Sequence, residues 1–344
     1  MLELEPQEAP AKLRYMNTMF HSRRAMFEAS ADMRLLEFFS YTRATLDIAI
    51  YDIRSRAVLE ALASLSKRAR VRIIVDAAAE PQLVDAALDP KPGTALAALE
   101  EVGLGKCIHP YASKLGRAMH HKFAIRDNAY VWAGGMNFTD GALNLQDASA
   151  LVLDSAALAE LFTQEFERIL ADQPHSTNPP GEVTVGKGNH VVALFGPQIK
   201  PALLAAMTDN PKRVRLISYA LSDGDLLDAL QRYGRSGRDL RGLYDPAGME
   251  IASKLHPACP ERFWFRQDPR FVAVPSNHFH LYGEHNGCLN KIWHINRTVF
   301  IGSYNFSDIT DPIENHVLAI TSPQIDLATN RYFDVLSNRY RLNV

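Results

Sequence analysis

The sequence predicts an α/β protein with two similar halves, each a mixed β-sheet with helices on both faces, packed side by side. Three observations support this fold class. A strand–helix–strand pattern occurs twice, a segment rich in turn-forming residues separates the two copies, and a polar motif recurs in altered form at the same spacing. The chain has 344 residues, of which 47% are hydrophobic and 22% charged, so it contains enough apolar material for a large core.

The first segment comprises residues 1–35, and its pattern predicts a mostly helical lead that packs on the first half. These residues lack the apolar stretch of a signal peptide, and no part of the sequence reaches the roughly 18 consecutive apolar residues of a membrane-spanning helix. The three cysteines, Cys107, Cys259 and Cys288, form neither a disulfide framework nor a zinc pattern. We therefore expect reduced thiols in a cytoplasmic protein.

The two copies of the repeat occupy residues 46–76 and 214–245. Each begins with an apolar run that ends in Tyr, continues with apolar residues at three- and four-residue spacing, and closes with a second apolar run that ends in Asp. The tyrosines lie 168 residues apart and the aspartates 169. We assign residues 36–172 to a first half, 189–344 to a second half, and 173–188, rich in Pro, Gly, Ser and Thr, to a linker.

A catalytic motif follows the first copy of the repeat. His120 and Lys122 alternate on a predicted strand, so both side chains point to one face, and Asn137 follows the next strand. The other fixed positions of the motif are Asp127, Gly134 and Gly135. This pattern resembles the HxK-x4-D-x6-G-[SG]-x-N motif of the phospholipase D superfamily. The resemblance implies two halves that meet about a pseudo-twofold axis and share one phosphate site at the seam between them.

The resemblance also implies a role for each residue. His120 attacks phosphorus and forms a covalent phosphohistidine, while Lys122 and Asn137 bind the phosphoryl oxygens, where negative charge develops. Asp147 follows the Asn at the position of the carboxylate that orients a catalytic His. Asp127 is structural, as are Gly134 and Gly135, and the latter stands where the family usually has Ser.

The second half retains only part of this motif. The spacing between the halves places Leu289 where the motif needs His and Asn296 where it needs Asp. The retained positions are Lys291, Gly302, Ser303 and Asn305. By resemblance, Lys291 and Asn305 bind phosphate, Gly302 and Ser303 are structural, and Glu314 is the second orienting carboxylate.

The missing second His leaves the leaving group without its acid, and general acid–base catalysis contributes about 10²–10⁴-fold. Three explanations stay open. Another histidine takes its place, the candidates being His278, His280, His285 and His294; we favour this explanation because the phosphate-binding residues survive. Alternatively, two chains pair so that two copies of His120 face each other, or the protein is a phosphate-binding pseudoenzyme. We predict no metal at the histidine-rich segment and no cofactor, because this chemistry needs neither.

The predicted function is a phosphodiesterase that hydrolyses or transfers the head group of a phospholipid. A nuclease of the same superfamily is the alternative, and a non-catalytic phosphate-binding protein is the third. The net charge of −2 and the pI of about 6.6 argue against non-specific nucleic-acid packaging. We expect a phosphodiester partner, phospholipid or nucleic acid, with transient membrane-surface contact for a lipid. A monomer is favoured over a homodimer because one chain carries both halves, and residues 78–92 and 261–285 are the expected specificity loops.

Overall fold

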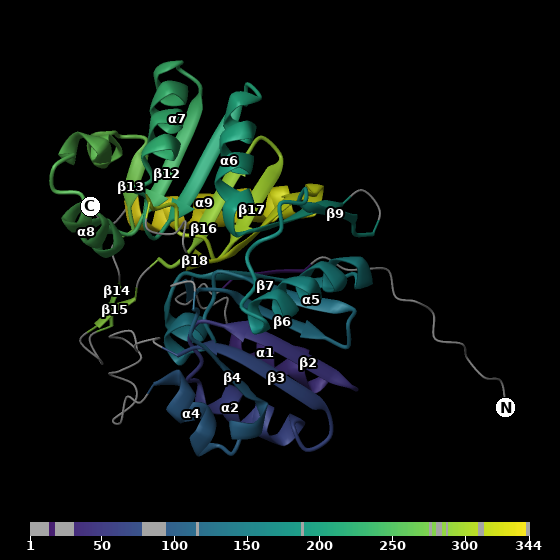
Figure 1. The fold of residues 1–344 in the computed structure, drawn as a ribbon. Coiled ribbons are helices and arrows are strands. Elements are labelled where there is room, and N and C mark those ends of the chain that lie inside the picture. Colours follow the sequence, from purple (N-terminus) through teal and green to yellow (C-terminus); the bar gives the residue numbers. More distant parts are fainter. Residues whose placement is uncertain are drawn as a thin grey trace.

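The computed structural model describes residues 14–17, 31–77, 94–114, 117–186, 189–274, 277–279, 284–286, 288–308 and 313–341. Two lobes, one per half, lie one above the other (Figure 1). Each is built on a mixed sheet in which three neighbouring strands are parallel and the others antiparallel. The predicted α/β class, with two similar halves, is therefore confirmed.

The two sheets have the same strand order. The first runs β4 (Ile108–Tyr111), β3 (Arg70–Asp76), β2 (Thr45–Ile50), β6 (Lys122–Arg126), β7 (Tyr130–Gly134), β8 (Ser149–Asp154) and β1 (Arg14–Asn17). The second runs β13 (Phe271–Ala273), β12 (Asp239–Tyr244), β11 (Arg213–Ser218), β16 (Lys291–Ile295), β17 (Thr298–Gly302), β19 (His316–Thr321), β10 (His190–Phe195) and β9 (Gly181–Thr184). Two short pairs, β14 (Asn277–Phe279) with β15 (Glu284–Asn286) and β5 (Ala118–Met119) with β18 (Ile313–Glu314), complete the described strands.

The helices form three layers around the sheets. The outer layers are α1 (Ala31–Ser40), α2 (Arg56–Leu65) and α4 (Ala95–Glu101) on the first sheet, and α6 (Ile199–Thr208), α7 (Gly224–Arg235) and α8 (Pro246–Leu255) on the second. The inner layer contains α5 (Ala156–Leu170) and α9 (Pro323–Arg341), whose apolar residues belong to one buried cluster with both sheets. Short helical turns occur at Gly105–Cys107, Gly141–Leu145, Gly196–Gln198 and Pro260–Gln267.

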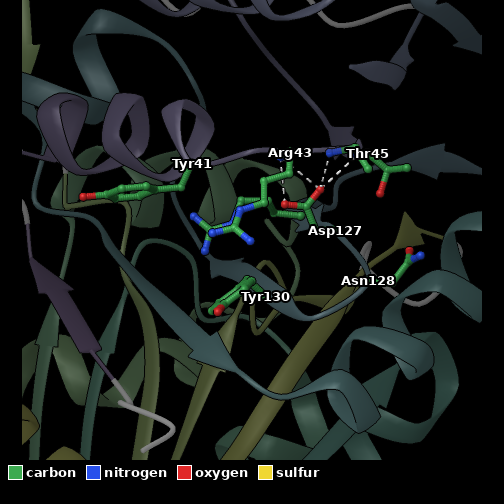
Figure 2. A pocket seen from close by; sticks show the side chains of 8 residues that line it. Tyr41, Arg43, Thr45, Asp127, Asn128 and Tyr130 are labelled. Atoms are coloured by element: carbon green, nitrogen blue, oxygen red, sulfur yellow. Dashed lines mark hydrogen bonds between the residues drawn. The ribbon is translucent and has the colours of Figure 1, made fainter. Parts of the chain in front are cut away.

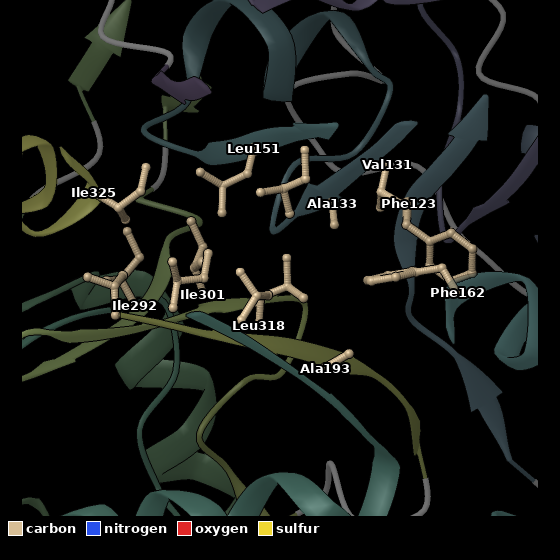
Figure 3. Packing of buried hydrophobic residues seen from close by; sticks show 14 of the residues in the cluster. Phe123, Val131, Ala133, Leu151, Phe162, Ala193, Ile292, Ile301, Leu318 and Ile325 are labelled. Atoms are coloured by element: carbon tan, nitrogen blue, oxygen red, sulfur yellow. The ribbon is translucent and has the colours of Figure 1, made fainter. Parts of the chain in front are cut away.

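One apolar core crosses the seam between the halves. Figure 3 shows Phe123 and Leu151 of the first sheet packed toward Ile301 and Leu318 of the second. Because burial of apolar surface is the main favourable contribution to folding, separating the halves would expose much of the core. The seam is thus a fixed part of the fold, and residues from both halves can be held at it with constant geometry.

The aspartates that close the repeat anchor the strand that enters the motif. Asp76 accepts a hydrogen bond from the Met119 backbone N–H at 2.8 Å, and Asp245 accepts one from the Cys288 N–H at 2.9 Å. Each donor directly precedes the position of the catalytic His or of Leu289. The repeat therefore positions the motif in both halves by the same contact.

The tight turn after β6 is tethered by Asp127, whose φ of 51° lies in the left-handed region. Its carboxylate accepts hydrogen bonds from the backbone N–H groups of Arg43, Ala44 and Thr45, at 2.8 to 3.2 Å (Figure 2). Asn296, with a φ of 55°, does the same in the second half: its Oδ1 accepts from the Lys212 N–H at 2.8 Å. An amide oxygen can therefore replace the carboxylate in this tether.

Two predictions about the chain connections need correction. The lead at residues 1–35 is not wholly helical, because Arg14–Asn17 forms β1, which pairs with the otherwise open edge of β8. The linker at residues 173–188 is not a simple connection either. Its residues Gly181–Thr184 form β9 on the edge of the second sheet, because pairing with β10 satisfies their backbone groups. Among the described residues, no helix combines the length and apolar character required to cross a bilayer.

We predict that Asp127→Ala lowers the free energy of unfolding by about 2 kcal/mol, because three backbone N–H groups lose a charged acceptor. Asp127→Asn should lose clearly less, since Asn296 makes the equivalent tether. Urea denaturation followed by circular dichroism measures both. Equal losses in the two variants would contradict the tether.

The pH dependence of the same comparison is a second check. Burial raises the pKa of Asp127, but the hydrogen bonds from Thr45, Ala44 and Arg43 outweigh this effect, so the pKa is lowered overall. A lowered pKa in the folded state adds stability above the ordinary carboxyl pKa of about 4. The advantage of wild type over Asp127→Asn should therefore be complete at neutral pH and disappear as the pH falls through the folded-state pKa.

Candidate active site

His120, which belongs to the first half, is held by the second half. β5 pairs with β18 across the seam, and the His120 backbone N–H donates to the Glu314 carbonyl at 2.9 Å. The imidazole Nδ1 of His120 lies 3.0 Å from the Ser303 carbonyl oxygen and 3.1 Å from Asn315 Oδ1. Both contacts come from the segment that carries the second copy of the motif.

These two contacts decide which ring nitrogen carries the proton. Asn315 is oriented by the Ser303 hydroxyl, which donates to Oδ1 at 2.9 Å, and by its own Nδ2, which donates to the Ile313 carbonyl at 3.2 Å. Since both neighbours of His120 Nδ1 are oxygens that accept, Nδ1 must donate. The lone pair is therefore on Nε2, the nitrogen available to attack phosphorus.

The charge state of His120 is set by its surroundings. Burial lowers the pKa of the imidazole well below its ordinary value, and the positive charges of Lys122 and Lys291 lower it further. The hydrogen bonds to Asn315 and Ser303 act in the opposite direction but are outweighed. His120 is therefore neutral at pH 7, as a nucleophile must be.

The two motif lysines have matching environments. Lys122 Nζ donates to the His120 carbonyl at 2.9 Å, and Lys291 Nζ donates to the Leu289 carbonyl at 2.7 Å. Each ammonium also lies near a tyrosine ring at the end of a repeat strand, 5.1 Å from the centroid of Tyr51 for Lys122, and 5.5 Å from that of Tyr219 for Lys291. The sequence analysis identified these tyrosines only as equivalent positions of the repeat. Their constant spacing along the chain agrees with their equivalent contacts to the two lysines.

The lysines form a site with an excess of positive charge. Both side chains are buried, and among the described residues neither forms an ion pair. Burial lowers the pKa of Lys122 well below its ordinary value, as does the charge of Lys291, while burial lowers the pKa of Lys291 to about 8. Two buried cations without a paired carboxylate are what a phosphodiester anion would stabilise.

The motif asparagines lie at equivalent points of the two halves. Each is followed by a phenylalanine that forms an isolated β-bridge to a residue just after the first strand of the repeat. Phe138, after Asn137, pairs with Ile53, and Phe306, after Asn305, pairs with Leu221. Asn137 is buried. The glycines Gly134 and Gly302 are required by close backbone contact, since a Cβ would lie 2.4 Å from the Ser149 carbonyl oxygen at the first and 2.0 Å from the His316 carbonyl oxygen at the second.

The two predicted orienting carboxylates do not contact His120. Asp147 is buried and accepts a hydrogen bond from the Tyr340 hydroxyl at 3.0 Å, and burial raises its pKa to about 6. Glu314 is also buried, with Arg168 at 2.5 Å, Arg117 at 2.8 Å and His175 at 2.7 Å. The residue after Glu314 holds His120 instead. Successive residues of a strand point to opposite faces, so a shift of one position decides which side chain reaches the imidazole.

Glu314 belongs to a buried ionic network behind the nucleophile. Burial would raise its pKa, but His175 and Arg168 lower the pKa to about 2. Arg168 also bonds Glu165 at 2.8 Å, and Glu165 contacts His121, whose ring stacks on His316. His121, Glu165 and Glu314 have ligand atoms within 4.8 Å of one another, but the Arg168 guanidinium bonds both carboxylates and supplies the positive charge there.

The surroundings of Leu289, on the opposite flank of the seam, differ from those of His120. The Gly135 N–H donates to the Ser149 carbonyl at 3.0 Å, and the Ser303 N–H donates to the His316 carbonyl at 2.9 Å, so these pairs are equivalent. Ala148 accordingly stands where the second half has Asn315, and Gly135 where it has Ser303. The Asn315 amide that contacts His120, and the Ser303 hydroxyl that orients this amide, have no counterparts beside Leu289.

The neighbour of Leu289 is likewise changed. Asn290 stands at the position of His121, and its amide donates to the Tyr332 hydroxyl at 2.7 Å and accepts from the Ser149 hydroxyl, also at 2.7 Å. A neutral hydrogen-bonded group thus replaces the His–His–Glu network. Loss of the second His is therefore accompanied by coordinated changes around it.

One predicted substitute for the missing His is wrong. His294 is buried and its Nε2 lies 2.8 Å from Asp326 Oδ1, beside Arg213. It follows Lys291 by three positions on β16, so the alternation of the strand turns it to the face that packs on α9. The side chains of His278 and His285, together with His280 and residues 78–92, lie outside what the structure describes.

Comparisons with known proteins agree with this geometry. A family model described as "Cardiolipin synthase, PLD-like domain" matches residues 35–170. The chain is 28% identical over 149 residues to mitochondrial cardiolipin hydrolase of Xenopus laevis (43% of this chain, 65% of the relative). It is 30% identical over 141 residues to that of Homo sapiens (41% of this chain, 51% of the relative). The chain thus spans about half to two-thirds of the length of these curated relatives.

Solved structures share the fold over nearly the whole chain. Phosphatidylserine synthase of Haemophilus influenzae Rd KW20 matches with a TM-score of 0.67 and 11% identity, covering 95% of this chain and 86% of that chain. Polyphosphate kinase of Porphyromonas gingivalis matches with a TM-score of 0.57 and 14% identity, covering 95% of this chain and 50% of that one. The family match identifies residues 35–170 as a PLD-like domain of the phospholipase D superfamily, and the solved structures show that the fold is shared over nearly the whole chain.

Proposed function

We propose that this protein is a phosphodiesterase that cleaves a phospholipid head group through a covalent phosphohistidine on His120. The observation that carries the proposal is the state of His120: a neutral imidazole with its Nδ1 proton held by Ser303 and Asn315, beside two buried lysines. A second function is not needed to explain any described feature of this site.

The reaction that fits this arrangement has two steps. In the first, Nε2 of His120 attacks phosphorus, the bond from phosphorus to the leaving oxygen breaks, and that oxygen takes up a proton. In the second, a water or alcohol oxygen loses a proton and attacks phosphorus, and Nε2 leaves. In our proposal Lys122 and Lys291 bind the phosphoryl oxygens of the substrate, and Asn137 and Asn305 add neutral donors.

The lipid substrate rests on the relatives. The family model and the curated relatives are named for cardiolipin, and one structural neighbour is named for phosphatidylserine synthesis. The acidic balance of this chain, with a net charge of −2, also favours a lipid over a long nucleic acid. We propose a monomer that meets the membrane surface transiently and retain a cytoplasmic location as a prediction.

The substrate class can be tested with vesicles of cardiolipin and phosphatidylglycerol against single- and double-stranded DNA. We expect release of lipid products and no DNA cleavage. DNA cleavage that falls steeply with salt would establish the nuclease alternative. Adding glycerol or ethanol distinguishes transfer from hydrolysis, because an alcohol acceptor yields a new phosphodiester.

We predict that His120→Ala lowers kcat on the order of 10³-fold or more, because no other group can form the phosphoenzyme. Radiolabelled substrate should leave an acid-labile label on wild type and none on the variant. The matched control is His190→Ala, because His190 lies on β10, which pairs with the edge strand β9 of the second sheet. Full turnover by His120→Ala would refute the nucleophile.

We also predict that Asn315→Asp moves the acidic limb of the kcat/KM profile to higher pH. A carboxylate beside Nδ1 favours the imidazolium, so the pKa of His120 rises and the neutral nucleophile is lost at a higher pH than in wild type. Ser307→Ala, in the same half, is the control and should leave the limb in place. An unchanged limb in Asn315→Asp would mean that Asn315 does not act on His120.

A further inference from the structure

The leaving oxygen needs a proton, and Leu289 cannot supply it. This inference concerns the acid and rests on the proposed phosphodiesterase function. The histidines near the site in the described part of the chain have other partners: His121 and His316 contact each other, His175 contacts Glu314, and His294 contacts Asp326. A different group must act where the second histidine is missing.

In-line displacement restricts where that group lies. The attacking and leaving atoms stand on opposite sides of phosphorus, so the acid must face the nucleophile. Lys122 is two residues from His120 on the same segment and therefore on the nucleophile's side. The equivalent lysine of the other half, Lys291, comes from the opposing side.

Lys291 also occupies the right place. Its Nζ lies 2.7 Å from the carbonyl oxygen of Leu289, the residue that stands in the position of the second His. Its Cδ would lie 3.8 Å from a Cβ built on Gly135, so the side chain packs beside the residue that stands at the position of Ser303. The ammonium is thus buried against the backbone of the missing acid's position.

We propose that Lys291 replaces the second histidine as general acid and then as general base. In the first step a proton passes from the Lys291 ammonium to the leaving oxygen as the bond to phosphorus breaks, leaving a neutral amine. In the second step that amine takes a proton from water while the water oxygen attacks phosphorus and His120 Nε2 leaves. Lys291 ends as the ammonium and His120 as the neutral imidazole, so the cycle closes without a further reactant.

The acidity of Lys291 suits both steps. Burial lowers its pKa to about 8, although Cys288 and Asp245 act to raise it. A group with this pKa is mainly protonated at pH 7, yet it gives up a proton far more readily than an exposed lysine.

Leaving-group chemistry provides the test. A p-nitrophenyl phosphodiester expels a stable anion and needs no acid, whereas a short-chain phosphatidylcholine does need one. The Lys291→Arg variant keeps the positive charge but cannot transfer its proton. With the p-nitrophenyl substrate we expect a burst of about one nitrophenolate per chain followed by slow turnover, because only the second step still needs the base. With phosphatidylcholine we expect no burst and a loss of about 10²–10⁴-fold.

Several outcomes would overturn the proposal. Equal losses on both substrates without a burst would show that Lys291 only binds phosphate. The same burst in a variant with His278, His280 and His285 replaced by Gln would assign the acid to that segment instead. Lys291→Met is a second variant if the Arg variant does not fold. In wild type, the rate of the first turnover of phosphatidylcholine should fall as the pH rises through about 8, because the ammonium of Lys291 loses its proton. The rate of the first release of nitrophenolate should not fall in this pH range.

The proposed phosphodiesterase function can be tested separately from the role of Lys291. His120→Ala must abolish the burst and the turnover of both substrates. Absence of turnover by wild type on both would reject the phosphodiesterase function itself, and the role of Lys291 with it.

Discussion

The hydrogen bonds from His120 Nδ1 to Ser303 and Asn315 cross the seam between the halves, and the chemistry of the site depends on them. They fix the tautomer and the orientation of the ring, and they leave the lone pair on Nε2. Since donor and acceptors belong to different halves, the site exists only while the seam is closed. The apolar core shared by the two sheets keeps it closed, so packing far from the site maintains the geometry of these hydrogen bonds.

The two halves keep the same scaffold but have different chemistry. Asp76 and Asp245 anchor the motif strands in the same way, and Asp127 and Asn296 tether the same turn. Around the first motif a buried ionic network contains paired charges, which is the arrangement that tolerates burial. Beside Leu289, the neutral amide of Asn290 stands at the position of His121, and the buried carboxyl of Asp147 accepts a hydrogen bond from the Tyr340 hydroxyl. A flank without a histidine has no need of a buried charge network, and this flank has none among the described residues.

Electrostatics at the seam favours an anion. Burial lowers the pKa of both lysines, the charge of Lys291 lowers that of Lys122 further, and both charges lower the pKa of His120. A bound phosphodiester would place negative charge beside both ammonium groups. Burial also strengthens each hydrogen bond that these groups would make to phosphoryl oxygens.

The sequence by itself determined the α/β class, the internal repeat, and the motif residues His120, Lys122, Lys291, Asn137 and Asn305, because periodicity and spacing are local properties of a chain. It also marked the position of Leu289. It could not show that Asn315, and not Glu314, reaches His120, because a one-residue change of strand face depends on pairing across the seam. It likewise misplaced His294, and treated as a linker the segment that forms β9 and supplies His175 to Glu314. Those contacts join residues that are distant in the sequence or satisfy a sheet edge, and only the tertiary structure decides them.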